Sequence, residues 1–244
     1  MRKFTVAIGI LSLIVSVAIK AETLTLTSLD WPPYTGKSLP DQGASVAVVK
    51  AAVEAMGHSL KVEFYAWPRT VHLAKTYKKI VGYFPAYKFD STDIIFSDKI
   101  GTGPLGFVEN VADPITWSSL NDLKSYKIGV FRGYANTAEF DAMVASGEIQ
   151  AVEAKYDDVN LKKVATKRVP LAVIDSNVLT YLVSNTTSLK QYDKTLVMNP
   201  KLLAEKGLYI AFTNDSEGKR WKAIVDEGLS KIDVNKVMND HLSQ

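Results

Sequence analysis

Cysteine is absent from the 244-residue chain, and its absence removes several kinds of site. Without thiols the chain can form no disulfide framework and no thiolate metal site, and no lipid-attachment cysteine follows its N-terminal apolar run. The fold must therefore be stabilised by its hydrophobic core, and a hydrophobic content of 47% is sufficient for one.

The chain also lacks a strong excess of charge of either sign. Its formal net charge is +3, from 29 basic and 26 acidic residues. Arg2, Lys3 and Lys20 lie in the N-terminal segment, so the rest of the chain has 26 basic and 26 acidic residues. This balance is unlike the basic footprint of nucleic-acid-binding proteins or a polybasic membrane patch, and we expect neither kind of partner.

Only one long apolar run occurs, and it lies at the N-terminus. Arg2 and Lys3 precede the nearly unbroken apolar run of residues 4–19, and a small-residue cleavage zone lies at residues 16–18 or at Ala21, the site that we favour. This three-part pattern is typical of a secretory signal peptide, so we expect residues 1–21 to be cleaved and the protein to reach the periplasm. A permanent anchor is the alternative, but the run is short for a span of about 20 residues.

Recognisable catalytic and metal-binding motifs are also missing. The three histidines, His58, His72 and His241, are isolated from one another and show no zinc-site spacing. Residues 101–106 match G-x-G-x-x-G by letter, but Pro104 interrupts the pattern and an apolar run follows where a dinucleotide site needs a helix. We therefore expect no metal, no cofactor and no enzymatic activity, and we assign these glycines to a crossover between lobes.

Strand and helix patterns alternate along the chain, which predicts an α/β fold. Strands are expected at residues 24–29, 60–65, 80–84, 94–96, 127–131, 171–174 and 208–212, and helices at residues 44–56, 68–77, 137–146, 161–166, 176–184 and 217–232. The pattern restarts near Asp113-Pro114, and this restart favours two lobes over one domain.

An aromatic turn, Asp30-Trp31-Pro32-Pro33-Tyr34, follows the first expected strand. Its two prolines exclude a helix and favour an extended turn. In α/β proteins ligands usually bind in the loops beyond the carboxyl ends of strands. Trp31 and Tyr34 are therefore candidates for a ligand platform, and a tryptophan that fills the core is the equal alternative.

A second candidate lies where residues 127–131 run into Arg132-Gly133-Tyr134-Ala135-Asn136. Asn136 and Glu139 have capping-box spacing, which predicts a helix start with free backbone N–H groups suited to a carboxylate or phosphate. An ordinary strand-to-helix connection is the commoner alternative.

Two further segments connect a strand to a helix. Asp175 is either a helix cap or the acceptor for a ligand ammonium group. In Trp67-Pro68-Arg69 the guanidinium either faces a cleft, where it would suit a carboxylate, or lies in solvent.

The leader, the turn at residues 30–34, Ile94-Ile95-Phe96-Ser97-Asp98-Lys99, and Asp122-Leu123-Lys124 before Ile128-Gly129-Val130 occur in an order that resembles one family. It is the family 3 extracellular solute-binding proteins, the polar-amino-acid receptors of ABC transporters. The resemblance implies a type II periplasmic-binding-protein fold with two α/β lobes, two hinge strands and a ligand cleft. Lobe 1 would be residues 22–107 plus 209–244, and lobe 2 residues 108–208, with crossings near residues 106–109 and 207–210.

The resemblance also assigns roles. Trp31 matches the aromatic that stacks on the ligand, the segment from Tyr134 to Asn136 matches the helix start that receives the α-carboxylate, and Asp175 matches the acid that binds the α-ammonium.

One departure concerns the α-carboxylate. The family's clamping arginine is replaced by Asp90, and Val81 replaces a usual aspartate. Loss of a bidentate guanidinium is not a neutral change, so either Arg69, Arg132 or Lys88 substitutes or the ligand is not an ordinary α-amino acid. Aromatic residues expected near the cleft would also suit a cationic ligand; they are Trp31, Tyr34, Trp67, Tyr83, Phe84 and Tyr87.

We therefore expect a monomeric periplasmic receptor that captures an amino acid or related amine by lobe closure and delivers it to an ABC permease. Two alternatives remain: a dehydratase of the cyclohexadienyl type on the same fold, for which Asp90 and Asp175 are the acid candidates, and a soluble sensory module.

Overall fold

The computed structural model describes residues 20–242, and it confirms the expected α/β fold. The strands are β1 (Thr23–Ser28), β2 (Ser59–Phe64), β3 (Gly82–Ala86), β4 (Ile94–Phe96), β5 (Gly101–Asn110), β6 (Lys127–Phe131), β7 (Gln150–Ala154), β8 (Leu171–Asp175), β9 (Leu196–Met198) and β10 (Ala204–Thr213). The helices are α1 (Ala44–Ala55), α2 (Trp67–Thr76), α3 (Ala138–Ala145), α4 (Asp157–Ala165), α5 (Ser176–Asn185), α6 (Ser216–Ser230) and α7 (Val234–Leu242). All but the last two residues of the expected signal peptide lie outside the described residues. Between residues 20 and 242, no helix has the length and apolar character needed to cross a membrane.

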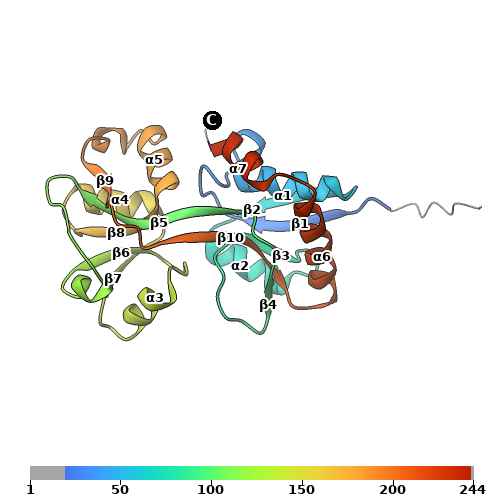
Figure 1. The fold of residues 1–244 in the computed structure, drawn as a ribbon, viewed down its shortest axis with the longest axis horizontal. Coiled ribbons are helices and arrows are strands. Elements are labelled where there is room, and N and C mark those ends of the chain that lie inside the picture. The colour runs from blue at the N-terminus through green and yellow to red at the C-terminus, as the bar shows by residue number, and fades with distance from the viewer. Residues whose placement is uncertain (1–19, 243–244) are drawn as a thin grey trace, which may run out of the picture.

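Two lobes lie side by side, and the long strands β5 and β10 run between them (Figure 1). The sheet order is β2-β1-β3-β10-β5-β8-β6-β7, with β4 paired to β10 and β9 paired to β5. Strands β1 to β4 belong to lobe 1, and β6 to β9 belong to lobe 2. The parallel pairs β1–β2 and β6–β7 bring the carboxyl ends of their strands toward the junction of the lobes.

The two crossing strands are antiparallel neighbours. Residues 204–208 of β10 pair with residues 101–105 of β5, and residues 105–109 of β5 already pair with β8 of lobe 2. The two crossing strands thus pair with each other over residues 101–105 and 204–208, and the lobe boundaries expected from the sequence stay a prediction. The three glycines of the rejected dinucleotide pattern all lie in β5.

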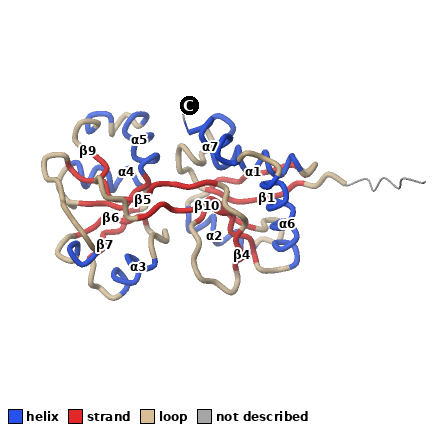
Figure 2. The backbone as a smooth tube through the Cα atoms, in the orientation of Figure 1, coloured by secondary structure: helices blue, strands red, loops and turns tan. Residues whose placement is uncertain are grey.

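Helices cover both faces of the sheet in each lobe (Figure 2). In lobe 1, α1, α6 and α7 lie on one side and α2 on the other, while in lobe 2 α4 and α5 lie opposite α3. Buried apolar side chains fill the space between these layers, among them Leu26, Val49, Ile174 and Val225. This core fixes the strand ends from which the functional side chains project.

Several expected boundaries need correction. Helix α4 begins at Asp157, four residues before the expected start, and α3 is capped by Thr137, whose side chain accepts the Phe140 N–H at 3.3 Å, in place of Asn136. The sequence patterns also missed β5, β7, β9 and α7. By contrast, Gly57 follows α1 with a φ of 76°, the left-handed conformation that a helix stop requires.

Candidate functional site

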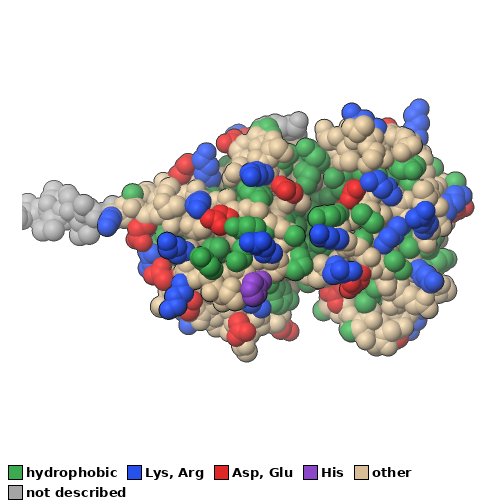
Figure 3. All heavy atoms as spheres, turned by 180° about the vertical axis from the view of Figure 1, so that it is seen from behind, with side chains coloured by type: hydrophobic (Ala, Val, Ile, Leu, Met, Phe, Trp, Pro, Cys, Tyr) green, Lys and Arg blue, Asp and Glu red, His purple; other side chains and the backbone are tan. Residues whose placement is uncertain are grey.

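A cavity of about 540 Å³ lies between the two lobes. Lobe 1 contributes Trp31, Trp67, Tyr83, Tyr87 and Phe89 to its wall, and lobe 2 contributes Phe131, Tyr134, Asn136, Phe140 and Glu153. The space-filling view shows the notch where the lobes meet, with hydrophobic side chains along it (Figure 3). The wall is mostly aromatic and apolar with few polar groups, as is typical of small-molecule sites.

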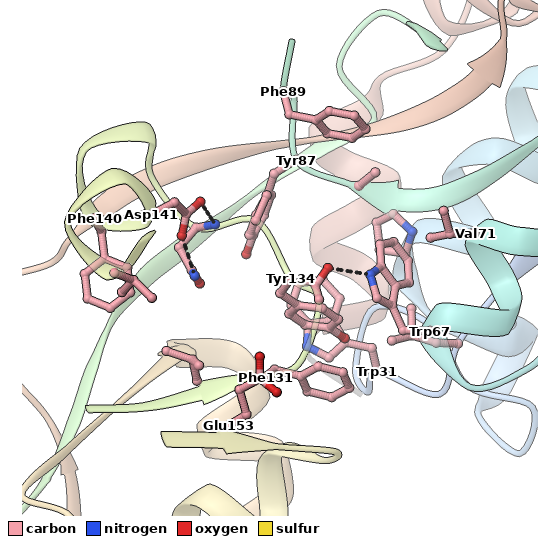
Figure 4. Close-up of a pocket in the computed structure, with 18 of the residues that line it drawn as sticks. Trp31, Trp67, Val71, Tyr87, Phe89, Phe131, Tyr134, Phe140, Asp141 and Glu153 are labelled. Carbon is pink, nitrogen blue, oxygen red and sulfur yellow. Dashed lines mark hydrogen bonds between the residues drawn. The ribbon is translucent and has the colours of Figure 1, made fainter. Parts of the chain in front are cut away.

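Trp31 is the centre of the aromatic wall (Figure 4). Its ring stacks on Tyr34 with centroids 4.7 Å apart, and Tyr134 and Tyr87 meet it edge-on at 6.3 and 6.4 Å. Trp67 meets Tyr134 edge-on at 5.4 Å. Because Trp31 is only 7% exposed and also packs in the core, it both fills the core and lines the cavity.

Direct hydrogen bonds join the lobes beside the cavity. The Trp67 indole N–H donates to the Gly133 carbonyl at 3.1 Å, the contact drawn in Figure 4. The Tyr34 hydroxyl lies 3.1 and 3.2 Å from the two carboxylate oxygens of Asp175, and the Asn177 side-chain amide donates to the Tyr34 oxygen at 2.8 Å. These hydrogen bonds connect the two lobes directly.

Asp175 caps α5 and is 2% exposed. Its Oδ1 accepts the backbone N–H groups of Asn177 at 2.8 Å and Val178 at 3.3 Å. Burial raises the pKa of its carboxyl to about 7, and the hydrogen bonds from Val178, Asn177 and Tyr34 act in the opposite direction. The helix-cap interpretation is thus confirmed, and the same carboxylate contacts Tyr34 of the other lobe, outside the cavity lining.

Asp157 is a buried acid that the sequence patterns missed. It is the first residue of α4, 8% exposed, where an acidic residue suits the helix dipole. Burial raises its pKa to about 7, the charges of Asp175 and Asp158 add to this effect, and a hydrogen bond from the Trp31 side chain opposes it. The charge of Asp175 thus acts on the carboxyl group of Asp157.

The expected anion site at α3 is already used by the chain's own carboxylate. Asp141 accepts the Asn136 backbone N–H at 2.8 Å and its side-chain amide at 2.9 Å, as Figure 4 shows. Asn136 is 8% exposed and lines the cavity, but its backbone N–H and its side-chain amide each donate to Asp141.

The three cations considered as substitutes for the missing arginine lie outside the cavity lining. Arg69 is exposed with its guanidinium 4.9 Å from the Tyr65 ring centroid. Arg132 is exposed and pairs with Glu153 at 2.8 Å, and Lys88 is exposed over Tyr209 at 4.2 Å. Three other expectations also need correction: Tyr34 and Phe84 are fully buried in the core and do not line the cavity, and Asp90 is exposed.

A different cation, Lys206 of strand β10, also lies outside the cavity lining, but it contacts two of the lining residues, Asn136 and Tyr87. Its Nζ donates to the Asn136 carbonyl at 2.6 Å and lies 4.8 Å from the Tyr87 ring centroid. Burial lowers the pKa of its ammonium group, and the charge of Asp141 opposes that effect. The sequence signal that could have identified it is its position on a hinge strand beside Gly207.

No family model and no curated protein matches this chain. Solved structures do resemble it: a histidine kinase sensor domain similar to periplasmic binding proteins has a TM-score of 0.75, with 17% identity over 91% of this chain and 94% of that one. An amino acid ABC transporter substrate-binding protein from Streptococcus pneumoniae, bound to L-arginine, has a TM-score of 0.71, with 18% identity over 91% and 94%. The chain has the fold of the family 3 solute-binding proteins.

The same fold occurs in the GluR0 ligand-binding core from Nostoc punctiforme in complex with L-glutamate. Its TM-score is 0.69, with 17% identity over 89% of this chain and 96% of that chain. These neighbours are binding proteins and receptor domains of the two-lobed kind, and the likeness extends over nearly the whole described chain. At identities this low, the comparisons establish the fold alone.

Proposed function

We propose that the protein is an exported receptor that captures a small amine or polar amino acid between its lobes. The observation that carries this proposal is the pair of inter-lobe hydrogen bonds, Trp67 to Gly133 and Tyr34 to Asp175, beside a cavity walled by both lobes. Each lobe supplies one part of the wall, so a ligand gains all its contacts only when the lobes are closed.

Closure requires a hinge, and strands β5 and β10 supply it. They are the two segments that run between the lobes, and they pair with each other over residues 101–105 and 204–208. A ligand that contacts both lobes binds the closed state more tightly than the open one, so it shifts the equilibrium toward closure.

The chemistry of the cavity favours a cationic ligand group. Two buried carboxyl groups, Asp157 and Asp175, lie behind an aromatic wall, and aromatic faces attract ammonium groups. For a ligand that also has a carboxylate, Lys206 takes the place of the missing arginine, because its ammonium is held between Asn136 and the Tyr87 ring.

The partner that we propose is an ABC permease that recognises the closed, monomeric receptor in the periplasm. Support comes from the shared fold with an ABC transporter substrate-binding protein and from the signal-peptide pattern in the sequence. The test of binding is a thermal-shift screen of amino acids, amines and small carboxylates, followed by calorimetry. Stabilisation by at least one amine or amino acid is expected, and a panel without any stabilising compound would contradict the proposal.

A sensory module is the second candidate, since the histidine kinase sensor domain has a TM-score of 0.75 to this chain. In that case ligand occupancy would be passed to a receptor and no permease would be involved. Permease and ATPase genes beside this gene would favour transport, and a kinase gene would favour sensing.

An enzyme is the third candidate, because a dehydratase on this fold needs a cleft acid whose pKa is raised, and burial raises that of Asp175 to about 7. Asp90, the other acid considered, is exposed and unsuited to this role. Turnover of a prephenate-like substrate that is abolished in Asp175→Asn would establish the enzyme.

A further inference from the structure

Two tyrosine hydroxyls at the aromatic wall are buried without a hydrogen-bond partner. They belong to Tyr87 of lobe 1 and Tyr134 of lobe 2, which Figure 4 labels among the residues that line the cavity. Burial raises the pKa of both phenols well above the ordinary value, and for both the negative charge of Asp157 adds to the effect. Asp157 is therefore close enough for its charge to act on both phenols, although it lies outside the cavity lining.

The two buried acids, Asp157 and Asp175, differ in how many hydrogen bonds their carboxylate oxygens accept. Asp175 accepts hydrogen bonds from Tyr34, Asn177 and Val178, so its acceptor capacity is largely used within the protein. Asp157 has no ion pair within residues 20–242, and the Trp31 side chain is the hydrogen-bond donor that acts on its pKa. Of the two, Asp157 keeps more free acceptor capacity at the junction of the lobes.

Buried polar groups are almost always hydrogen-bonded, and buried charges are almost always paired. A ligand ammonium with N–H groups meets both requirements here, because it supplies a positive charge for the carboxylate and donors for the phenol oxygens. A quaternary ammonium has the charge but no N–H donor, and a neutral alcohol has a donor but no charge.

We propose that Asp157 is the counter-ion for a primary or secondary ammonium group of the ligand, which is enclosed by the rings of Trp31, Tyr87 and Tyr134. Trp31 and Tyr87 come from lobe 1, whereas Tyr134 and Asp157 come from lobe 2, so this cage is complete only when the lobes are closed. The inference rests on the proposed receptor function and moves the ammonium-binding role from Asp175, which the family resemblance indicates, to Asp157.

The test compares four probes in thermal-shift and calorimetric titrations: cadaverine, L-lysine, tetramethylammonium and 1,5-pentanediol. Cadaverine and 1,5-pentanediol are matched in length and differ in charge. Each probe is titrated against the wild type, Asp157→Asn, Asp175→Asn and the control Asp158→Asn. Asp158 is the neighbouring residue on α4 and forms a partly exposed pair with Lys162 at 2.8 Å. Circular dichroism verifies that each variant is folded.

The wild type is expected to bind cadaverine or L-lysine, to bind tetramethylammonium at least tenfold more weakly, and to show no response to 1,5-pentanediol. Asp157→Asn should weaken binding of the two amines at least tenfold, and Asp158→Asn should change it less than twofold. If Asp157→Asn binds the amines as the wild type does, Asp157 is a structural acid of α4 and the inference is wrong, while the receptor proposal stands. If neither these probes nor any compound of the wider panel binds the wild type, both proposals fail.

Discussion

The Tyr34 hydroxyl lies 3.1 Å from Oδ2 of Asp175, a residue 141 positions further along the chain and in the other lobe. The same hydroxyl oxygen accepts the Asn177 side-chain amide at 2.8 Å, so one phenol connects the turn after β1 to the start of α5. This contact joins the aromatic turn to the capped helix, so the two lobes are connected by specific hydrogen bonds as well as by apolar packing.

Removal of this hydroxyl is expected to destabilise the closed form. Tyr34→Phe keeps the ring stack with Trp31 but leaves the Asp175 carboxylate and the Asn177 amide each short of a partner. The free energy of unfolding in urea should fall by about 1–3 kcal/mol, the cost of an unsatisfied buried polar group.

The matched control for that variant is Tyr65→Phe, which removes a hydroxyl bonded to Glu63 at 2.9 Å within lobe 1. It should change the free energy of unfolding by less than about 0.5 kcal/mol, as for most surface substitutions. Equal effects of the two variants would show that the inter-lobe bond contributes nothing specific.

Gly103 on β5 has no side chain, and this leaves room for the contact between Tyr34 and Asp175. A Cβ at this position would overlap Oδ2 of Asp175 and approach the Tyr34 hydroxyl oxygen to 2.8 Å. Gly103→Ala should therefore lower the free energy of unfolding by about 1–3 kcal/mol, as overpacking does, and weaken ligand binding. Thr102→Ala, at an exposed position on the same strand, should leave both quantities near the wild-type values in denaturation and calorimetry, and a comparable loss there would contradict the steric argument.

The buried acids predict an unusual pH dependence of stability. Burial raises the pKa of both Asp157 and Asp175 to about 7, so the folded chain binds these protons more tightly than the unfolded chain does. The stability from this source is fully present below about pH 4 and is lost as the pH rises through about 7, by a few kcal/mol at about 1.4 kcal/mol per pKa unit. Urea denaturation across this range should show a smaller loss in Asp157→Asn than in the wild type, and parallel curves would refute the assignment.

Ligand binding should respond to pH in the opposite direction. A cation binds the ionised carboxylate, and ionisation of Asp157 increases as the pH rises through about 7. Calorimetric affinity for cadaverine is therefore expected to increase between about pH 5.5 and 8, and the increase should be smaller in Asp157→Asn. A pH-independent affinity in the wild type would exclude the carboxylate as the counter-ion.

If Lys206 binds the ligand carboxylate, its loss should weaken binding only of ligands that have a carboxylate. Lys206→Met removes the cation between Asn136 and Tyr87, so binding of L-lysine should weaken about tenfold or more, as for loss of a charged hydrogen bond, while binding of cadaverine should change little. Lys201→Met is the control, since Lys201 lies over Trp117 at 4.6 Å, away from the cavity lining. If binding of L-lysine and of cadaverine weakened equally in Lys206→Met, Lys206 would not be the group that binds the ligand carboxylate.

Much of the fold follows from local patterns, because amphipathic periodicity and helix stops are properties of neighbouring residues. The missed elements β5 and α7 have weak local signals. Strand β5 contains Gly101, Gly103 and Pro104, which locally favour a loop, and it is a strand because β10 and β8 pair with it on either side. Helix α7 is short and polar, and only Met238 of its side chains is buried in the core.

The residues of the candidate site also divide into those that the sequence could predict and those that it could not. Trp31, Trp67 and Tyr134 could be predicted because they follow strand ends, where ligands are usually met. Asp157 could not, since an acid in the first turn of a helix is ordinary in sequence and its burial depends on the opposing lobe. Lys206 was missed for a related reason: its position beside Asn136 depends on the course of β10 between the lobes.

The most direct test of the account is the distance between the lobes in solution. Because the chain has no cysteine, His72→Cys on α2 and Glu139→Cys on α3 give one spin label in each lobe at exposed positions. Double electron–electron resonance with and without a bound amine from the panel should show a longer, broader distance distribution without ligand and a shorter, narrower one with it. An unchanged distribution at saturating ligand would contradict capture by lobe closure.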